Sequence, residues 1–377
     1  MWRRYHCGRE WPGAVPRATR AAVAPFPRTL RDNPYCDLLY RALAGAGVRI
    51  EDAAELSPSW IWRERRRVAV LHLHWPEFYY RGPKGAVTAR DLAAFVFDVL
   101  LALALGYRVV WTVHNQLPHE AQKVDRFIYW FLRRTAQTVT HCEAARALLG
   151  PARREPAVIP HGHYIGWYPD TLQREEARTR LGLQRGEKVL LCFGQLRAYK
   201  GVEDLLRAFQ RVSDPKLRLV VAGRPASDAD ARLLGELVSS LGDERVQLHP
   251  RYVPDDEVQV FFRACDLVVL PYRSVLTSGA AMLALSFGRP LIVPRLGCLK
   301  ELASQGCALD YEPEAPGALE EAIRIAARVD ATLLGQRARK TAEGLGWERI
   351  ARAYMRVYGL RGSVRDDSAE PTRRVSA

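Results

Sequence analysis

The sequence has no closely paired cysteines. Its seven cysteines are scattered along the chain, and no two of them form a C-x-x-C pair. Zinc sites and redox motifs depend on such close spacing, and small secreted proteins use dense frameworks of disulfides. The pattern therefore argues against a zinc site and against a disulfide framework. It predicts free, buried thiols in a reducing compartment.

Long apolar runs are also missing. The nearest candidate, LAAFVFDVLLALALG at residues 92–106, is interrupted by Asp98, and a membrane-spanning helix needs about 20 apolar residues. We interpret this segment as a mostly buried helix. Residues 1–20 carry charge but no apolar stretch before a cleavage site, so we expect no signal peptide. Residues 1–20 and the polar tail at 361–377 are expected to be disordered.

Acidic residues are scarce relative to basic ones. The chain has 56 Lys and Arg against 42 Asp and Glu, a formal net charge of +14. Such a balance suits phosphate-rich partners such as nucleotide-linked substrates, anionic lipid or nucleic acid. An arginine-rich composition with solvated faces explains it equally well. Because the basic residues are dispersed and no helix-turn-helix, RNA-binding sheet motif or zinc spacing appears, we expect no nucleic-acid partner.

Short apolar runs alternate with helical stretches along the chain. Continuous apolar strands between helices indicate parallel sheets covered on both faces. The pattern predicts an α/β fold with two Rossmann-like doubly wound domains, at residues 21–165 and 166–345, and a final helix at 347–360. The expected strands are 21–25, 47–50, 68–74, 108–113, 137–141, 156–160, 188–193, 217–223, 245–250, 266–271, 290–294 and 307–311.

Ligands of open α/β sheets bind at the carboxyl ends of the strands, so the residues after each strand carry most information. After residues 188–193 come Gly194, Arg197 and Lys200, then Gly201 and a helix. A glycine turn, two cations and a helix N-terminus together predict an anion site. The alternative is a basic surface loop.

A second turn that leads into a helix follows residues 266–271. Thr277, Ser278 and Gly279 precede the apolar helix AAMLALSFG. A hydroxyl there caps the helix, and the remaining first-turn N–H groups point outward. A plain helix cap is the simpler interpretation. Together with Arg197 and Lys200, we expect the corner to complete a clamp for a diphosphate.

Other strand ends offer further candidates. The loops holding Gly223, Pro225 and Glu257 are placed to frame a base and ribose. In the first half, histidines follow three successive strands, and Glu77 lies just beyond one of them. A buried histidine is usually structural, but one at a strand end can contact a sugar or move a proton. The three histidines are His74, His114 and His141.

Several of these segments resemble glycosyltransferases of the GT-B fold, in the broad family-4-like group. The resemblance rests on FGQLRAYKGVEDLLRAF, LVVAGRP, DLVVLPY, GRPLIVP, VIPHG and WTVHN, in this order and spacing, and it covers roughly residues 21–360. It implies two Rossmann-like domains that face each other across a cleft. The C-terminal domain would hold a nucleotide-sugar donor, and the N-terminal domain, joined by the final helix at 347–360, would hold the acceptor. Lys200 matches the lysine that neutralises the donor diphosphate, and Trp347 and Tyr354 would face inward from the final helix.

The sequence departs from that group at two points. The arginine of the group's FGR pattern is Gln195 here, and we expect Arg197 to replace it. The group's two glutamates, eight residues apart, are replaced by Val275 and Leu283. Ribose binding must therefore be handled otherwise, and Glu257 is the candidate.

The resemblance implies hexosyl transfer without a metal ion or other cofactor. Arg197, Lys200 and the N–H groups near Ser278 would stabilise the departing diphosphate. We interpret Asp228 and Asp230 as the first turn of a helix rather than as metal ligands. If the reaction inverts the anomeric carbon, His114 or Glu77 would be the base; if it retains configuration, His114 would contact the sugar.

The acceptor is expected to be a sugar, lipid-linked or part of a polysaccharide or glycoconjugate precursor. Basic and aromatic residues at 62–67 and 129–134 suit an anionic membrane surface, so we expect a cytoplasmic protein, peripheral at the inner face of the membrane. Solvated arginines explain them equally well. Two alternatives stay open for the whole chain: a nucleotide-sugar epimerase or hydrolase of the same fold, and a catalytically silent binding partner.

Overall fold

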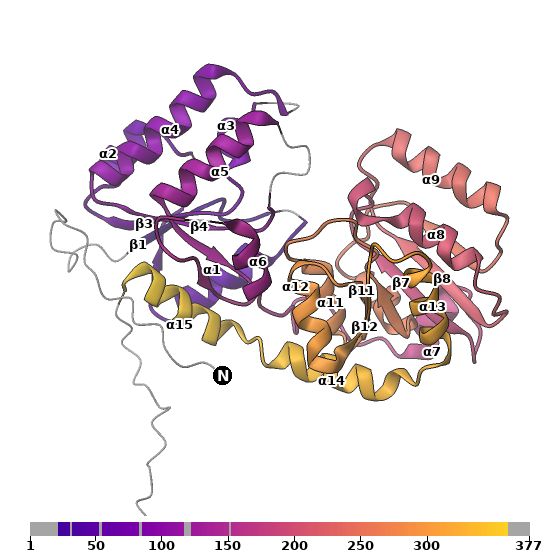
Figure 1. Ribbon diagram of the computed structural model, residues 1–377. Coiled ribbons are helices and arrows are strands. Elements are labelled where there is room, and N and C mark those ends of the chain that lie inside the picture. Colours follow the sequence, from indigo (N-terminus) through magenta and orange to yellow (C-terminus); the bar gives the residue numbers. More distant parts are fainter. Residues whose placement is uncertain are drawn as a thin grey trace, which may run out of the picture. The chain divides into compact units, whose positions relative to one another are not determined.

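The computed structural model describes residues 22–30, 32–52, 55–82, 85–116, 122–150 and 152–360. Strands and helices alternate along the chain and form two six-stranded sheets with helices around them (Figure 1). This confirms the expected α/β class, and all twelve predicted strands occur with ends within two residues of the prediction. The predicted extensions at 1–20 and 361–377 lie outside the described residues.

The strands are β1 (Ala22–Phe26), β2 (Arg49–Ile50), β3 (Val68–Leu73), β4 (Arg108–Thr112), β5 (Gln137–Thr140), β6 (Ala157–Val158), β7 (Lys188–Phe193), β8 (Leu217–Ala222), β9 (Val246–His249), β10 (Leu267–Val269), β11 (Leu291–Pro294) and β12 (Ala308–Tyr311).

The helices are α1 (Tyr35–Gly45), α2 (Pro58–Glu64), α3 (Glu77–Tyr80), α4 (Ala89–Ala104), α5 (Lys123–Thr135), α6 (Glu143–Leu149), α7 (Arg174–Arg180), η3 (Ala198–Lys200), α8 (Val202–Gln210), α9 (Asp228–Leu241), α10 (Val258–Ala264), α11 (Gly279–Ser286), α12 (Gly297–Leu302), η4 (Ala303–Cys307), α13 (Ala318–Arg328), α14 (Ala331–Glu343) and α15 (Trp347–Tyr358).

The two sheets have different strand orders. The first runs β2-β1-β3-β4-β5-β6, and the second runs β12-β11-β10-β7-β8-β9. Every neighbouring pair of the second sheet is parallel. Both are doubly wound orders, in which the chain reverses its direction of travel across the sheet at one point. The chain divides into two compact units with boundaries at Val110/Trp111 and Ile350/Ala351; the predicted domain limits at residues 165 and 345 stay predictions.

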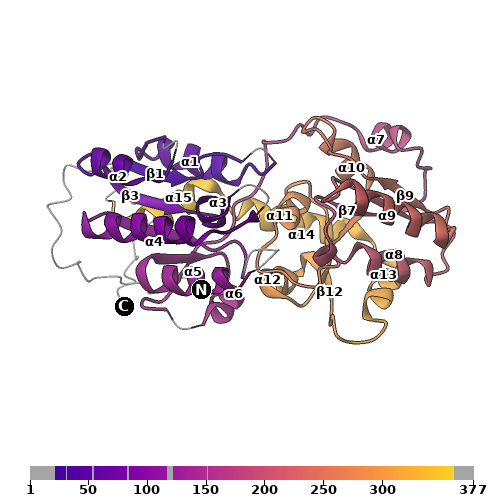
Figure 2. The same ribbon diagram turned by 90° about the horizontal axis from the view of Figure 1, so that it is seen from above.

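The second sheet has a continuous apolar core on one face. Side chains of β7, β8, β10 and β11 pack there against α8, α9 and α13, and Phe209 and Ile323 are fully buried. Figure 2 shows α8, α9 and α13 beside these strands from a second direction. Helix α11 is apolar on all sides, and its residues from Ala281 to Ser286 are all buried, as expected of a helix without a polar face.

The final helix belongs to the core of the first unit at its C-terminal end. The Tyr354 hydroxyl lies 2.9 Å from the hydroxyl of Tyr35, and the Tyr358 hydroxyl lies 2.8 Å from His72 Nδ1. Tyr354 is fully buried and Trp347 is 8% exposed. The inward orientation expected for Trp347 and Tyr354 is therefore confirmed.

The prediction that the thiols are all free is wrong at one place. Cys142 and Cys298 form a disulfide with their Cα atoms 5.6 Å apart, across a sequence separation of 156 residues. Spacing rules detect cysteines that are close in sequence, whereas this pair is brought together by the packing of α6 against α12. The other cysteines in the described ranges are free and buried; they are Cys36, Cys192, Cys265 and Cys307.

The helix expected to be mostly buried is also different. Helix α4 buries Phe95, Asp98, Val99 and Ala102, but Phe97 is 55% and Leu100 is 48% exposed. One face of the helix is buried while apolar residues continue around it, so an apolar sequence did not mean burial. Burial and the nearby charge of Glu55 raise the pKa of Asp98 to about 6.

Short helices escaped the sequence analysis. Helices α2 and α3 have seven and four residues, too few for a clear 3.6-residue period. Ser57 caps α2 and Pro58 occupies its first turn, which is the available local signal. None of the helices among the described residues is long and apolar enough to cross a membrane.

Candidate functional site

The topology of the second sheet places its reversal between β7 and β10. From β7 the chain proceeds to β8 and β9 on one side, and from β10 it proceeds to β11 and β12 on the other. The loops that leave the carboxyl ends of two such strands diverge and leave a crevice between them, which is where doubly wound sheets bind ligands. The two predicted anion-binding corners are the loops after β7 and β10.

Two glycines let neighbouring loops touch at this edge. Gly201 has φ 67°, and a Cβ there would lie 2.0 Å from the carbonyl oxygen of Pro271; Gly223 has φ 145°, and a Cβ there would lie 1.7 Å from the carbonyl oxygen of Gly194. No side chain fits at either distance, so glycine is required for both contacts. The loop after β7 is thereby held against the loops after β10 and β8.

Lys200 and the start of α11 line one small cavity. Its volume is about 100 Å³, and it is lined by Lys200, Thr277, Ser278, Gly279 and Asn115 among others. The structure therefore brings together the lysine and the Thr-Ser-Gly corner that the sequence analysis selected. The cavity combines one cation with a helix N-terminus, the two elements that bind phosphate groups.

The charge in this cavity is positive and comes from Lys200, which has no ion-pair partner among the described residues. Lys200 Nζ lies 5.4 Å from the centre of the Tyr272 ring and 3.1 Å from where a Cβ on Gly194 would be, and no carboxylate of the described residues forms an ion pair with it. Ser278 Oγ accepts from the N–H of Ala281 at 3.2 Å, which confirms Ser278 as the cap. Within the described ranges no acceptor is found for the N–H of Gly279.

Arg197 is placed elsewhere. Its Nε donates to Oε1 of Gln195 at 3.2 Å, and it lines a second, larger cavity together with Pro225 and residues after β8. Glu257 is partly exposed and forms an ion pair with Arg251; it lines neither of these two cavities. The structure thus brings Lys200, but not Arg197, to the start of α11.

The histidines at strand ends form a row in the second unit. The ring centres of His114 and His141 are 5.2 Å apart, and those of His141 and His161 are 5.4 Å apart. The row continues to Tyr164, whose hydroxyl lies 3.4 Å from His161 Nε2 and 3.1 Å from where a Cβ on Gly279 would be. It therefore ends beside the cavity that contains Lys200.

Sequence reasoning did not single out His161 or Tyr164. His161 follows β6 as the other histidines follow β3, β4 and β5, so the same strand-end rule would have found it. Burial lowers the pKa of His141 to about 4, and burial with the neighbouring His141 lowers that of His161 to about 3. Both rings are therefore neutral at pH 7.

The two candidates of the first unit, His74 and Glu77, lie outside this histidine row. His74 is 1% exposed, and its Nε2 lies 2.6 Å from the hydroxyl of Tyr40, which also lies 2.7 Å from His72 Nδ1. These contacts give His74 a structural place in a buried Tyr–His cluster. Glu77 begins α3. No group of three or more potential metal ligands occurs in the described part of the chain.

Comparisons with known proteins agree with this geometry. Residues 187–328 match the family profile described as glycosyl transferases group 1. The chain is 32% identical over 358 residues to a GDP-mannose:glycolipid 4-beta-D-mannosyltransferase of Xanthomonas campestris pv. campestris, covering 90% of this chain and 94% of that protein. It is 30% identical to D-inositol 3-phosphate glycosyltransferase 1 of Catenulispora acidiphila, covering 77% and 71%.

Solved structures share the whole architecture. Sucrose-phosphate synthase from Thermosynechococcus elongatus superposes with a TM-score of 0.70 at 17% identity, covering 90% of this chain and 98% of the other. Anabaena HepE in complex with UDP superposes with a TM-score of 0.69 at 14% identity, covering 90% and 99%. At such identities the likeness shows the fold, which is GT-B. The sequence relatives and this fold together show that the chain belongs to the GT-B glycosyltransferases of the broad family-4-like group.

Proposed function

We propose that this glycosyltransferase transfers a mannosyl group from GDP-mannose to a glycolipid acceptor, without a metal ion or other cofactor. Its support is the similarity to the Xanthomonas mannosyltransferase, which extends over nearly the full length of both chains. The observation that carries the chemistry is the cavity in which Lys200 lies beside the N-terminus of α11.

The proposed mechanism stabilises the leaving group. As the bond between the sugar and the diphosphate breaks, negative charge grows on the departing oxygen. The Lys200 ammonium and the N–H groups of Gly279 and Ala280 offset that charge. They are held by the packing of the protein before the reaction begins, so little reorganisation is needed when the charge appears. Metal independence follows in this proposal because the Lys200 ammonium and the N–H groups supply the positive charge.

We propose that the reaction inverts the anomeric carbon. The name of the Xanthomonas relative specifies a β-linked mannosyl product, and a β product from an α-linked sugar nucleotide requires attack from the opposite face. A base must then take the proton of the acceptor hydroxyl. His114, which is 7% exposed, and Glu77 remain the proposed candidates.

We propose that the acceptor is lipid-linked and met at an anionic membrane surface on the cytoplasmic side. Helix α5 carries an outward stripe of Lys123, Arg126, Phe127, Trp130 and Arg134 at helical spacing. Phe127 and Trp130 are 44% and 46% exposed, and the guanidinium of Arg134 lies 5.0 Å from the Trp130 ring. Exposed aromatic rings flanked by cations suit the interface of an anionic bilayer.

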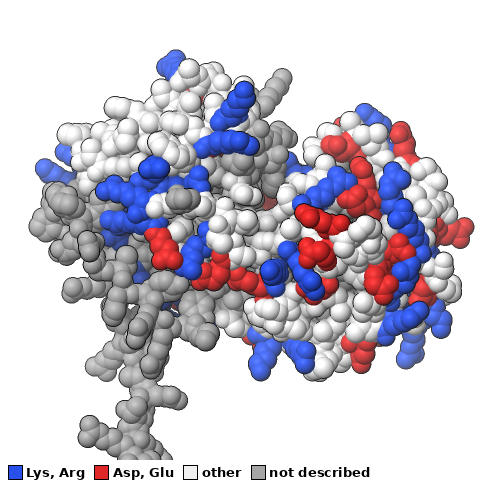
Figure 3. Space-filling view, in the orientation of Figure 1, with Lys and Arg blue, Asp and Glu red and all other residues white. Residues whose placement is uncertain are grey.

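The wider surface supports the same proposal. In the view of Figure 3 the part containing β7–β12 has acidic and basic side chains interleaved, whereas the part containing β1–β6 shows basic side chains, few acidic ones and broad uncharged areas. An uncharged surface with scattered cations is suited to lipid contact, while an evenly mixed surface is typical of one that faces water.

The test measures mannosyl transfer and GDP binding in one set of variants. The full chain is incubated with GDP-mannose and a glycolipid extract, and GDP binding is followed by thermal shift. A ligand at 100 times its dissociation constant stabilises the fold by about 2.7 kcal/mol. We expect Lys200→Ala to lose that shift and to lower kcat/KM by roughly 100-fold or more, and Lys216→Ala, an exposed lysine of the same unit, to retain both.

Each other outcome contradicts part of the proposal. A full shift in Lys200→Ala would refute the phosphate assignment. GDP binding without transfer to any acceptor would favour the silent binding partner, which the replacement of the family's glutamates by Val275 and Leu283 also favours. Release of mannose without an acceptor would favour a hydrolase.

A further inference from the structure

The larger cavity at the carboxyl edge of the second sheet has its own chemistry. It measures about 400 Å³ and lies where the loops after β7, β8 and β9 meet. Pro225 and Pro250 supply apolar surface, Arg197 and Arg224 supply two guanidinium groups, and Asp228 supplies a carboxylate. A concave cavity of this size, with polar and charged side chains beside two prolines, has room for a small polar molecule.

The walls of this cavity are fixed by the backbone. The N–H of Leu196 donates to the carbonyl oxygen of Arg224 at 2.9 Å, and Leu196 pairs with Pro225 in an isolated parallel bridge. The segment from Gln195 to Lys200 borders both cavities, because Arg197 lines the larger one and Lys200 lines the smaller one. The two cavities therefore share this segment as a common border.

The Asp228 carboxylate is not used by the protein. Helix α9 is capped by Ser227, whose Oγ accepts from the N–H of Asp230 at 3.2 Å and donates to the Asp230 carboxylate at 2.6 Å. Asp230 thus completes the cap, while the exposed Asp228 forms no hydrogen bond or ion pair with any described residue. Asp228 is the acidic side chain that lines the cavity.

We propose that this cavity binds the guanine base of the donor and that Asp228 is the residue that selects it; this inference rests on the proposed function. The two carboxylate oxygens of Asp228 accept hydrogen bonds from N1–H and from the 2-amino group of guanine. The guanidinium groups of Arg197 and Arg224 donate to the acceptors on its other edge, O6 and N7, which is the usual pairing of arginine with guanine. Pro225 and Pro250 lie against the faces of the base.

Other bases fit this arrangement poorly. Uracil presents a single N–H between two carbonyl oxygens, so a carboxylate gains one hydrogen bond and faces two acceptors. Adenine has an acceptor at N1, where guanine has a donor, and that acceptor repels the carboxylate. A bound base that covers the carboxylate without pairing both of its oxygens loses affinity relative to one that pairs both. Asp228 would therefore separate guanine donors from the other two.

The experiment compares GDP with inosine diphosphate, which lacks only the 2-amino group. Affinities of the full chain for GDP, inosine diphosphate and UDP are measured by calorimetry. We expect the wild type to bind GDP roughly 10-fold more tightly than inosine diphosphate, since a hydrogen bond to a charged group is lost. In Asp228→Asn we expect GDP to bind roughly 10- to 100-fold more weakly and the ratio of the two affinities to fall toward one, while UDP binds as tightly as to the wild type or more tightly.

Asp230→Asn is the matched control, because Asp230 lies two residues away on the same helix and belongs to the cap. It should leave the ratio of GDP to inosine diphosphate affinity as in the wild type. Unchanged GDP affinity in Asp228→Asn, or an equal loss for GDP and UDP, would overturn the inference. If Lys200→Ala still loses GDP in that case, the proposed function stands without it; if the wild type binds no nucleotide, both fail.

Discussion

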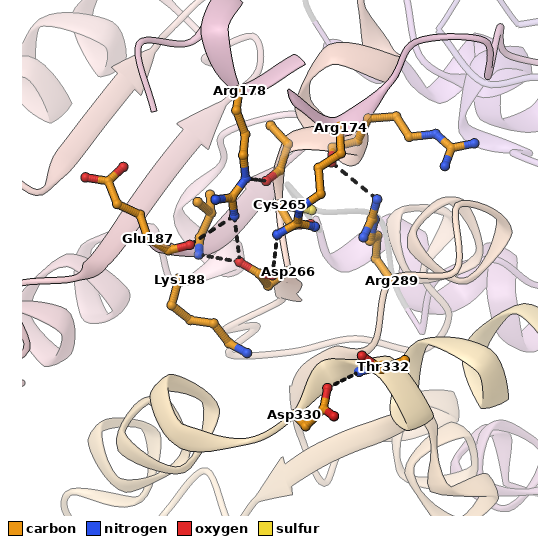
Figure 4. A network of polar contacts seen from close by, with 12 residues as sticks. Arg174, Arg178, Glu187, Lys188, Cys265, Asp266, Arg289, Asp330 and Thr332 are labelled. Atoms are coloured by element: carbon orange, nitrogen blue, oxygen red, sulfur yellow. Dashed lines mark hydrogen bonds and ion pairs between the residues drawn. The ribbon is translucent and has the colours of Figure 1, made fainter. Parts of the chain in front are cut away.

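At the amino edge of the second sheet a partly buried carboxylate is surrounded by partners, whereas at its carboxyl edge two charged side chains of the described residues have no ion-pair partner. Just before β10, the Asp266 carboxylate accepts from Arg174 at 2.6 Å, from Arg178 at 3.0 Å and from the N–H of Val189 at 2.7 Å (Figure 4). At the other edge, Lys200 and Asp228 form no ion pair within the described ranges. The paired cluster contributes to folding, and the unpaired groups are available to a ligand.

The physical reason for the difference is the cost of burying charge. Arg178 is 7% exposed, and it also donates to the carbonyl oxygens of Ala264, Gln184 and Glu187. A buried charge is tolerated only when such partners replace water. Lys200 and Asp228 at the carboxyl edge remain close to solvent, which stabilises their charges when no ligand is bound. Removing a charged group at the amino edge should therefore lower the free energy of unfolding. Removing one at the carboxyl edge should instead weaken ligand binding.

The largest expected effect on folding comes from breaking the paired edge. Asp266→Ala leaves Arg178 buried without its charge partner, and we expect the free energy of unfolding to fall by about 3–5 kcal/mol. Chemical denaturation measures it. Glu176→Ala removes the exposed partner of Arg180 on the same helix, where both side chains are 54% exposed, and should cost no more than about 1 kcal/mol. Equal losses in the two variants would contradict the comparison.

Lowering the pH should destabilise the fold through protonation of the histidine row and not through the cluster of Arg174, Arg178 and Asp266. The pKa values of His141 and His161 in the folded protein, about 4 and about 3, lie below the ordinary value near 6.5. Between these limits the unfolded chain binds more protons, so the free energy of unfolding is at its full value above about pH 6.5 and decreases as the pH falls. At pH 5 each histidine should cost about 2 kcal/mol.

Thermal denaturation at pH 7 and pH 5 measures this loss. His161→Gln should reduce the difference between the two pH values, whatever its own effect on stability at pH 7. A variant with the same pH dependence as the wild type would show that the row does not titrate in this way.

The smallest effect is expected at the cap of α11. Ser278→Ala removes the hydroxyl that accepts from Ala281, and helix caps are worth about 1 kcal/mol. Because Ser278 also lines the cavity with Lys200, the same variant separates folding from binding: stability should change little, while the thermal shift with GDP decreases. Ser227→Ala removes the cap of α9 and is the matched control for stability. A Ser278→Ala variant with a full GDP shift would place the diphosphate away from this cap.

The strands and their ends were readable from the sequence, because burial on both faces makes a strand a short apolar run and polar residues follow where it leaves the sheet. That pattern located Lys200 and the Thr-Ser-Gly corner as neighbours at one edge, since the carboxyl ends of parallel strands share an edge. The resemblance to known glycosyltransferases rested on the same loops.

Other features depend on contacts between distant segments, which local patterns do not encode. The Cys142–Cys298 bond joins residues 156 apart, and the exposed face of α4 follows from how much of an apolar helix the neighbouring elements cover. Arg197 and Lys200 are three residues apart, yet they line different cavities, because the backbone turns through η3 between them. Sequence spacing selects the types of group available at an edge, and the path of each loop decides which of them meet the same ligand.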